Sequence, residues 1–142
     1  MKVLLDVNVV VDVLARRAAF FEDSYAVLSL VAEQEIDGFI AAGSVADIDY
    51  ILRRQGLDKA RSREALVNLT QIVGVVDTKT VDVTEALMSA MPDLEDAVLA
   101  ACAHRVGADA IITRDPHDFK DSRVPAVDPA QFLARLGGDE RP

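Results

Sequence analysis

The chain has 142 residues, of which 51% are hydrophobic and 27% charged, and its formal net charge is −9. This length fits one compact domain with a real core, and the hydrophobic content excludes disorder as the default. The acidic balance argues against a broad basic surface that holds nucleic acid by neutralising phosphates.

The N-terminus does not resemble a secretory signal, because Asp6 interrupts the apolar run after only a few residues. No stretch reaches the ~18 uninterrupted apolar residues of a membrane helix. The single cysteine, Cys102 in "AVLAACA", fits a buried, reduced thiol rather than a disulfide framework. We therefore expect a cytoplasmic protein.

Strand and helix patterns alternate along the whole chain without a low-complexity break. In chain order they are strand 2–5, a helix after residue 8, helix 20–35, strand 38–42, helix 44–54, helix 58–72, strand 75–77, helix 81–90, helix 93–106, strand 109–113, strand 124–127 and helix 129–136. Gly38 and Gly74 are read as stop signals of the helices before them, and Ser44 as the cap of the helix after it.

Strands separated by helices predict parallel pairing and hence a three-layer α/β/α sandwich, with a parallel sheet of about four to five strands. We expect a single domain over residues 1–136 and a frayed C-terminal tail over 137–142. Ligands of such sheets bind beyond the carboxyl ends of the strands. Functional residues are therefore expected directly after strands.

Two acidic residues fit that position. The stretch "LLDVNVVVDVL" sets Asp6 and Asn8 into a mainly apolar run, and Asp6 follows the first strand. Asp115 comes two residues after the strand "IIT". Because a buried carboxylate is costly unless it is paired or binds a metal, their placement suggests a metal site.

Two further stretches offer carboxylates. In "MPDLEDAVLAACA", Asp93 is suited to cap the helix with Asp96 as its capping-box partner, but Asp96 also directly precedes the most apolar part of the helix. In "GSVADIDYILRR", Asp47 and Asp49 flank opposite margins of the apolar face. Spacing alone leaves the choice between these two open, and either can be an ordinary solvated residue.

Carboxylates gathered in one cleft repel by about 4 kcal/mol per pair at ~4 Å and an effective dielectric constant of ~20. A cation offsets that repulsion. Oxygen ligands without histidine or cysteine clusters suit Mg²⁺ or Mn²⁺ rather than zinc. Hydrolysis of phosphodiester bonds is a natural chemistry for such a site.

Four stretches, "LLDVNVVVDVL", "SVADIDYILRR", "DLEDAVLAACAHRVGADAIITRD" and "PHDF", together resemble a PIN-domain nuclease. The resemblance is closest to the toxin of bacterial VapBC-type toxin–antitoxin pairs, and it covers about residues 1–134 in the right order. It implies an endoribonuclease that uses Mg²⁺ or Mn²⁺ to cut RNA. It also implies a small antitoxin that lies over the active-site groove, and a homodimer.

The resemblance implies an acidic quartet of catalytic and metal-binding residues, namely Asp6, Asp47, Asp96 and Asp115. Asp6 and Asp96 are its principal ligands. The family usually carries Glu where this chain has Asp47, whose side chain is about one methylene shorter. Asn8 and Thr113 match small polar residues that support the first and fourth carboxylates. We give Asp118 of "PHDF" a structural role in the loop.

Basic residues and histidines offer weaker candidates. Arg114, next to Asp115, is the best single candidate for a substrate contact, whereas His104 is expected at the surface and His117 stays possible as a substrate contact. A basic cluster comprises Arg53, Arg54, Lys59, Arg61 and Arg63. It is either a guide for RNA phosphates, a solvated helical face or a seat for an acidic partner segment.

Apolar side chains of the helices at 20–35 and 43–55 can supply a contact surface for the antitoxin or the second subunit, although ordinary core packing is expected to account for most of them. They are Phe20, Phe21, Tyr25, Ile48, Tyr50 and Ile51.

Two other functions are considered. A catalytically silent PIN-like scaffold would keep the fold without the chemistry. A receiver-like signalling domain also gathers carboxylates at a sheet edge, but it needs adjacent acids after the first strand and a lysine after a late one. Here Val7 follows Asp6, and "IITRD" has no lysine.

Overall fold

The computed structural model describes residues 1–139 and is built around one five-stranded sheet in the order β3-β2-β1-β4-β5. Every neighbouring pair of strands is parallel. The strands are β1 (Lys2–Leu5), β2 (Asp37–Ala41), β3 (Gly74–Val76), β4 (Ala110–Ile112) and β5 (Ala126–Val127). The predicted parallel sheet is confirmed, with β5 at an edge.

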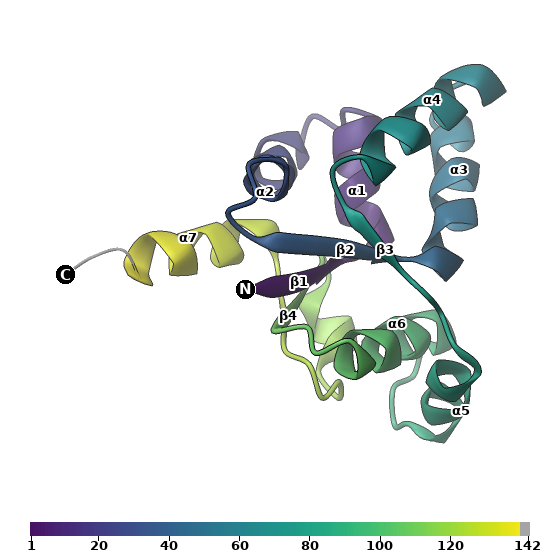
Figure 1. Cartoon of the computed structure of the whole chain (residues 1–142), viewed down its shortest axis with the longest axis vertical. Helices are drawn as coiled ribbons and strands as arrows, with labels where there is room; N and C mark the ends of the chain where they lie inside the picture. The colour runs from purple at the N-terminus through teal and green to yellow at the C-terminus, as the bar shows by residue number, and fades with distance from the viewer. Residues whose placement is uncertain (140–142) are drawn as a thin grey trace.

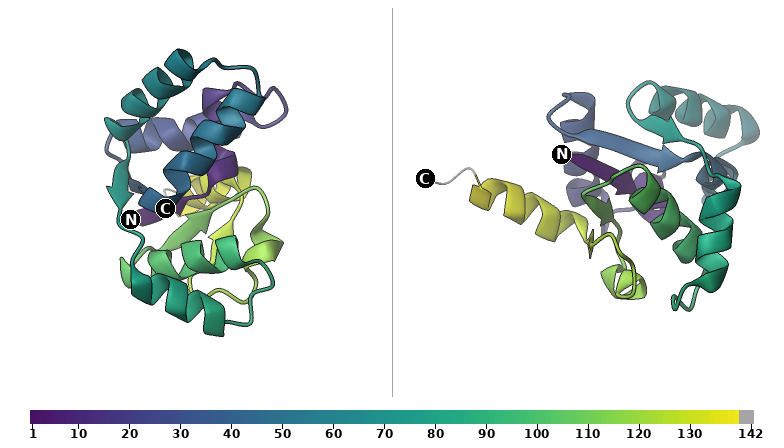
Figure 2. Two further views of the ribbon diagram at one scale, coloured as in Figure 1. Left: turned by 90° about the vertical axis from the view of Figure 1, so that its right-hand side faces the viewer. Right: turned by 60° about the horizontal axis from the view of Figure 1, so that its bottom comes forward.

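Helices cover both faces of this sheet, which confirms the predicted three-layer sandwich (Figure 1). One face carries α1 (Val7–Leu14), α2 (Phe21–Ala32), α3 (Val45–Arg54) and α4 (Lys59–Thr70). The other face carries α6 (Leu94–Arg105), against which α5 (Thr80–Met88) packs. Figure 2 shows the same division from two further directions.

The core is split by the sheet into two clusters. Alternate side chains of a strand point to opposite faces, so Val3 and Leu5 join the cluster under α1 to α4. Leu4, between them, joins the cluster under α6. Because β1 is buried on both faces, its sequence is a continuous apolar run rather than an alternating one.

The chain ends in α7 (Pro129–Asp139), which packs against α2. The expected frayed tail at 137–142 therefore begins inside this helix, and its last three residues lie outside the described part of the chain. Within residues 1–139, no helix is long and apolar enough to cross a membrane.

Two glycines were predicted as helix stops, and both predictions are wrong. The helix α2 ends at Ala32, and the chain turns at Gln34, whose φ is 61°. Gly38 and Gly74 instead lie in β2 and β3. A Cβ on Gly38 would stand 2.5 Å from Cγ2 of Val31, so glycine there lets α2 approach the sheet closely.

The expected assignment of six aromatic and aliphatic side chains mostly to the core is also wrong. Ile48 is fully buried, whereas Phe20, Tyr25 and Tyr50 are exposed. The remaining two, Phe21 and Ile51, are partly buried. Apolar surface is therefore present on α2 and α3.

The order of the strands places the functional edge. From β1 the chain passes outward to β2 and β3, then returns across the sheet to β4 on the other side of β1. The connections therefore diverge beyond the carboxyl ends of β1 and β4, the place where α/β sheets bind ligands. Asp6 and Thr113 are the residues that follow these two strands.

Candidate active site

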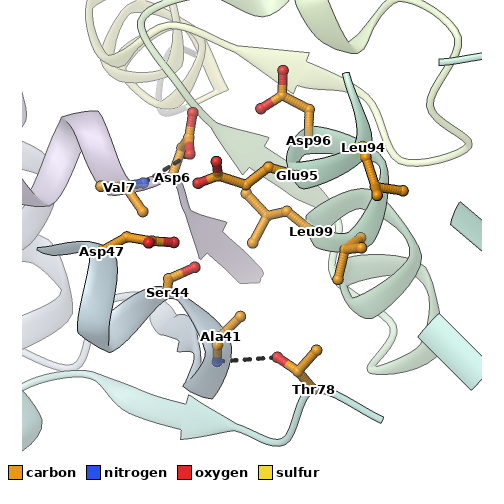
Figure 3. Close-up of a pocket in the computed structure, with 12 residues that line it drawn as sticks. Asp6, Val7, Ala41, Ser44, Asp47, Thr78, Leu94, Glu95, Asp96 and Leu99 are labelled. Carbon is orange, nitrogen blue, oxygen red and sulfur yellow. Dashed lines mark hydrogen bonds between the residues drawn. The ribbon is translucent and has the colours of Figure 1, made fainter. Parts of the chain in front are cut away.

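A cavity of about 440 Å³ opens at this edge of the sheet (Figure 3). Four carboxylate side chains from three elements line it: Asp6 after β1, Asp47 in the first turn of α3, and Glu95 and Asp96 in the first turn of α6. Its other walls are mainly apolar and include Val7 and Leu99. Three of the four predicted acidic residues therefore share one cavity.

Asp6 is held in place by its position as the N-cap of α1. Its side chain accepts a hydrogen bond from the Val7 N–H at 2.8 Å, and its own N–H donates to the Ile112 carbonyl at 2.9 Å. Thr113, which is fully buried, donates its hydroxyl to Asp6 Oδ2 at 2.8 Å. Burial raises the pKa of Asp6, the charge of Asp115 adds to this, and the two hydrogen bonds oppose it.

Asp115 lies beside this group without lining the cavity. Its N–H donates to the Thr113 hydroxyl at 3.1 Å, and Asn8 Nδ2 donates to Asp115 Oδ2 at 3.4 Å. Asn8 Oδ1 also accepts from the Arg114 N–H at 3.3 Å. Thr113 therefore contacts both Asp6 and Asp115, and Asn8 contacts Asp115.

Asp47 is presented by the loop after β2. A short 3₁₀ helix, Ala42–Ser44, leads into α3, and the Gly43 N–H donates to the Thr78 hydroxyl at 3.1 Å. This bond ties the loop after β2 to the loop after β3. Ser44 occupies the N-cap position, but its side chain makes no capping hydrogen bond, contrary to expectation.

Asp96 is half-buried at the start of α6, where Asp93 caps the helix by accepting from the Asp96 N–H at 2.9 Å. Asp93 therefore has the capping role that the sequence offered. Burial raises the pKa of Asp96 to about 7, and the negative charges of Asp93 and Asp6 contribute. A carboxyl group with this pKa exchanges its proton near neutrality.

Glu95 is a cavity residue that the sequence analysis did not select. Figure 3 shows its carboxylate pointing from α6 toward Asp6, with Asp47 on the same side of the cavity. Burial raises its pKa, followed by the charges of Asp47, Asp93 and Asp6. The sequence signal was weak, because an acidic residue in the first turn of a helix is common on dipole grounds alone.

The donor set fits a hard divalent cation. All four side chains at the cavity offer carboxylate oxygens. Burial is the main cause that raises the pKa values of Asp6, Glu95 and Asp96, and the charges of neighbouring carboxylates add to it. Within residues 1–139, no three Asp, Glu, His or Cys side chains converge into a closed metal site. Mg²⁺ commonly binds through one or two carboxylates and keeps several waters, so it does not need such a cage.

Basic side chains are absent from the lining of the cavity as described. Arg114 lies with Nε 3.1 Å from Asp12 Oδ2 and with its guanidinium over the Phe20 ring. The basic cluster occupies the end of α3 and the start of α4. None of its five residues lines the cavity. His104 is exposed on α6, as expected, and His117 is exposed in the loop after Asp115.

Comparison with protein families explains this arrangement. A sequence model of the PIN domain family matches residues 2–117. The chain belongs to the PIN domain family. This match spans most of the chain and includes all the predicted site residues, from Asp6 to Asp115. It confirms the family that the four sequence stretches suggested.

Solved structures share the fold of this PIN domain at low sequence identity. VapBC2 from Rickettsia felis, bound to a DNA fragment from its promoter, has a TM-score of 0.72 and 15% identity, covering 90% of this chain and 98% of that one. FitAcB from Neisseria gonorrhoeae has a TM-score of 0.69 and 21% identity, with the same coverage. VapBC-1 from nontypeable Haemophilus influenzae has a TM-score of 0.64 and 15% identity, covering 92% and 99%. The search of curated proteins finds no match.

The topology is not that of a receiver domain. Receiver-type sheets have the strand order 2-1-3-4-5, whereas this PIN domain has the order β3-β2-β1-β4-β5. The residue after Asp6 is Val7, so the paired acids of a receiver are missing as well. The signalling alternative is therefore excluded by the arrangement of the sheet.

Proposed function

We propose that this PIN domain is a metal-dependent endoribonuclease and the toxin of a toxin–antitoxin pair. The observation that carries the proposal is the cavity at the carboxyl edge of the sheet, lined by Asp6, Asp47, Glu95 and Asp96. Folding brings these like charges together at a cost in repulsion. A cation bound among the carboxylates would offset this repulsion and could bind a phosphodiester substrate. The three solved structures, VapBC2, FitAcB and VapBC-1, support the toxin assignment.

In this proposal the residues take the roles that the family resemblance implies. Asp6, fixed through both oxygens by Val7 and Thr113, and Asp96 are the principal ligands in this proposal. Asp47 and Asp115 complete the site directly or through water. When bound, Mg²⁺ or Mn²⁺ supplies charge stabilisation at the phosphate and lowers the pKa of water.

In this proposal a carboxylate at the cavity accepts the proton of the attacking water. Burial raises the pKa of Asp96 to about 7 in the metal-free protein, and a bound cation would hold this ligand ionised. The attack is in line with the leaving 3′ oxygen, so that the P–O3′ bond breaks, the upstream fragment ends in a 3′-hydroxyl and the downstream fragment keeps the phosphate on its 5′ oxygen. No histidine lines the cavity within residues 1–139, so the carboxylates carry the acid–base chemistry.

The decisive experiment is cleavage of a mixed set of RNAs by the purified protein in Mg²⁺, Mn²⁺ or EDTA. We expect cleavage with 5′-phosphate products in either metal, none in EDTA, and a loss of at least 100-fold in Asp6→Asn and Asp96→Asn. Asp23→Asn, an exposed charge change on α2, is the matched control and should cut like the wild type.

The alternative of a silent scaffold makes the opposite prediction. A scaffold would cut no RNA in the set, and Mn²⁺ would not bind in calorimetry. Metal binding that depends on Asp6 and Asp96 without cleavage would indicate a narrow target RNA. Cleavage that persists in EDTA or in both variants would contradict the proposed chemistry.

The proposed partners are a small antitoxin that covers the active-site groove and a second copy of this chain. An apolar cavity with an acidic edge suits a partner segment that carries apolar residues and a basic side chain. Co-expression with the product of a small upstream reading frame should yield a complex that no longer cuts RNA. Light scattering on the free protein then tests the homodimer, and a monomer at all concentrations would contradict it.

A further inference from the structure

Asp12 is a fully buried carboxylate that the proposed chemistry does not use. It lies on α1 with 0% of its side chain exposed, and none of the residues within the described chain gives its two oxygens a well-aligned hydrogen bond. Two arginines lie close to it, with Arg114 Nε 3.1 Å from Oδ2 and Arg17 Nη1 3.6 Å from Oδ1. The buried Ser24 hydroxyl also faces this carboxylate. A buried charge of this kind needs a reason.

Arg114 is held from two sides. Its Nε faces Asp12, and its Cζ lies 4.2 Å from the centre of the Phe20 ring. A guanidinium between a carboxylate and an aromatic face has a restricted orientation. The side chain is only 23% exposed. These contacts leave Arg114 facing α1 and the start of α2.

The face of α1 that carries Asp12 also contacts the backbone of Arg114. Asn8 and Asp12 are four residues apart in the helix and so lie on one face. Asn8 accepts from the Arg114 N–H and donates to the Asp115 carboxylate, while Asp12 attracts the Arg114 side chain. Asn8 and Asp12, on two successive turns of α1, therefore contact the two residues that follow Thr113, namely Arg114 and Asp115.

We propose that Asp12 and Arg114 form a positioning pair, which fixes the segment that carries Asp115 against α1 and keeps Arg114 from acting as an RNA-binding residue. This inference rests on the proposed ribonuclease function for its kinetic consequence. An ion pair buried this deeply adds little net stability compared with apolar residues of the same size. Its value lies in the fixed placement of Asp115 beside Asp6.

The test compares Asp12→Asn, Arg114→Gln and the double variant with the wild type. A pair that acts through Asp115 lowers kcat for RNA by about tenfold or more in each single variant, the usual scale for residues behind metal ligands. KM stays within about twofold. The double variant is no slower than the slower single variant, because the two residues act as one unit.

Exposed residues supply the matched control. Arg123 and Glu85 form an ion pair at 3.0 Å whose side chains are 61% and 44% exposed. Glu85→Gln and Arg123→Gln make the same charge changes outside the site, and we expect both to keep the wild-type kcat and KM. All assays are run well below the melting temperature of each variant, so that only folded protein is compared.

Three results would overturn the positioning role. A rise in KM in Arg114→Gln, without an effect of Asp12→Asn, would make Arg114 an RNA contact. Additive effects in the double variant would separate the two residues. Unchanged kcat in variants that only melt at a lower temperature would make the pair purely structural. If Asp12→Asn does not fold, the split between kcat and KM in Arg114→Gln still decides.

A readout without RNA separates this inference from the ribonuclease proposal. Hydrogen exchange of the amides of Arg114 and Asp115 should be about tenfold faster in Asp12→Asn, and the affinity for Mn²⁺ should fall by a similar factor. These results support the inference even if the wild type cuts no RNA. Unchanged exchange and unchanged Mn²⁺ affinity would overturn it even if the wild type is an active nuclease.

Discussion

The two ends of α6 treat acidic side chains in opposite ways. At its C-terminal end, Arg105 contacts both oxygens of the buried Asp82 of α5 at 2.9 and 3.0 Å. Burial alone would raise the pKa of Asp82, but the hydrogen bonds from Arg105 and the Lys79 N–H hold it below its usual value. At its N-terminal end, Glu95 and Asp96 form no ion pair within residues 1–139, and their pKa values are raised.

At the C-terminal end of α6 the fold therefore neutralises the carboxylate of Asp82. At the N-terminal end it leaves Glu95 and Asp96 without an ion-pair partner in the described chain. The Asp82–Arg105 pair joins α5 to α6, and the arginine also donates to the Asp77 carbonyl. This contact supports the loop that carries Thr78 to the cavity. Structural carboxylates are therefore paired within the chain, whereas cavity carboxylates are available to a cation from outside.

The largest effect is expected where the pairing is complete. Asp82→Asn removes the charged partner of Arg105, whose side chain is 25% exposed, and should lower the free energy of unfolding by about 1–3 kcal/mol. Urea denaturation measures this change. The exposed pair Arg123–Glu85 is the control, and Glu85→Gln should cost no more than about 1 kcal/mol. Equal losses of unfolding free energy in Asp82→Asn and Glu85→Gln would contradict the contrast between the buried pair and the exposed pair.

The carboxylates at the two ends of α6 should affect the pH dependence of stability in opposite directions. Asp96 has a folded pKa of about 7 against an ordinary value of 3.8, so the folded state binds more protons between these values. The free energy of unfolding of the metal-free protein should therefore fall as pH rises from about 4 toward 7. The contribution of Asp82 to the free energy of unfolding has the opposite sign, because its pKa is lowered in the folded state. This contribution is lost as pH falls below the ordinary pKa of the group.

Urea denaturation in EDTA across this pH range tests the prediction. Asp6, Asp12 and Glu95 also have raised pKa values and add to the slope with the same sign. Asp96→Asn should therefore reduce the slope rather than remove it. A stability that rises steadily from pH 4 to pH 7 would contradict the assignment.

Removal of one cavity charge should stabilise the metal-free protein. Asp96→Asn relieves repulsion from Asp93 and Asp6 at pH 8, and we expect a gain of roughly 1 kcal/mol in the free energy of unfolding. Thermal denaturation in EDTA measures it, with Asp23→Asn as the control for a charge change on an exposed helix. A loss of stability would mean that Asp96 has a structural partner in the fold.

The smallest effect is expected at the cap of α6. Asp93→Ser keeps a side-chain oxygen for the Asp96 N–H but removes the charge that raises the pKa of Asp96. Stability should change by no more than about 0.5 kcal/mol, while the pKa of Asp96 should move down. A titration of its carboxyl carbon by NMR reports this shift, and an unchanged pKa would show that the charge of Asp93 does not contribute to it.

The sequence predicted the fold because its signals were local. Short apolar runs marked the strands, and the acidic residues after two of them indicated the edge at which a site would form. Gly38 and Gly74 misled because a glycine stops a helix in one context and admits a close neighbour in another. Only the tertiary contact with Val31 or Phe39 distinguishes these cases.

The sequence identified part of the candidate site, and it missed Glu95 and Asp12 for different reasons. Glu95 has no local mark, since its approach to Asp6 and Asp47 depends on how α6 docks. Asp12 did carry a mark, because it interrupts the apolar run "VVVDVL" just as Asp6 interrupts the strand. Its partner Arg114 is about a hundred residues away, which no spacing rule connects to it.

The distance along the chain between the two halves of the site has a consequence for synthesis. Thr113 holds Asp6 across a separation of 107 residues, and β4 completes the sheet beside β1 only after α6 has been made. A growing chain carries Asp6 and Asp47 long before it carries Asp96 and Asp115. Because the pairing of β1 with β4 waits for the late strand, a growing chain that still lacks β4 cannot bring Asp115 beside Asp6. The candidate site therefore forms only after most of this PIN domain has been synthesised.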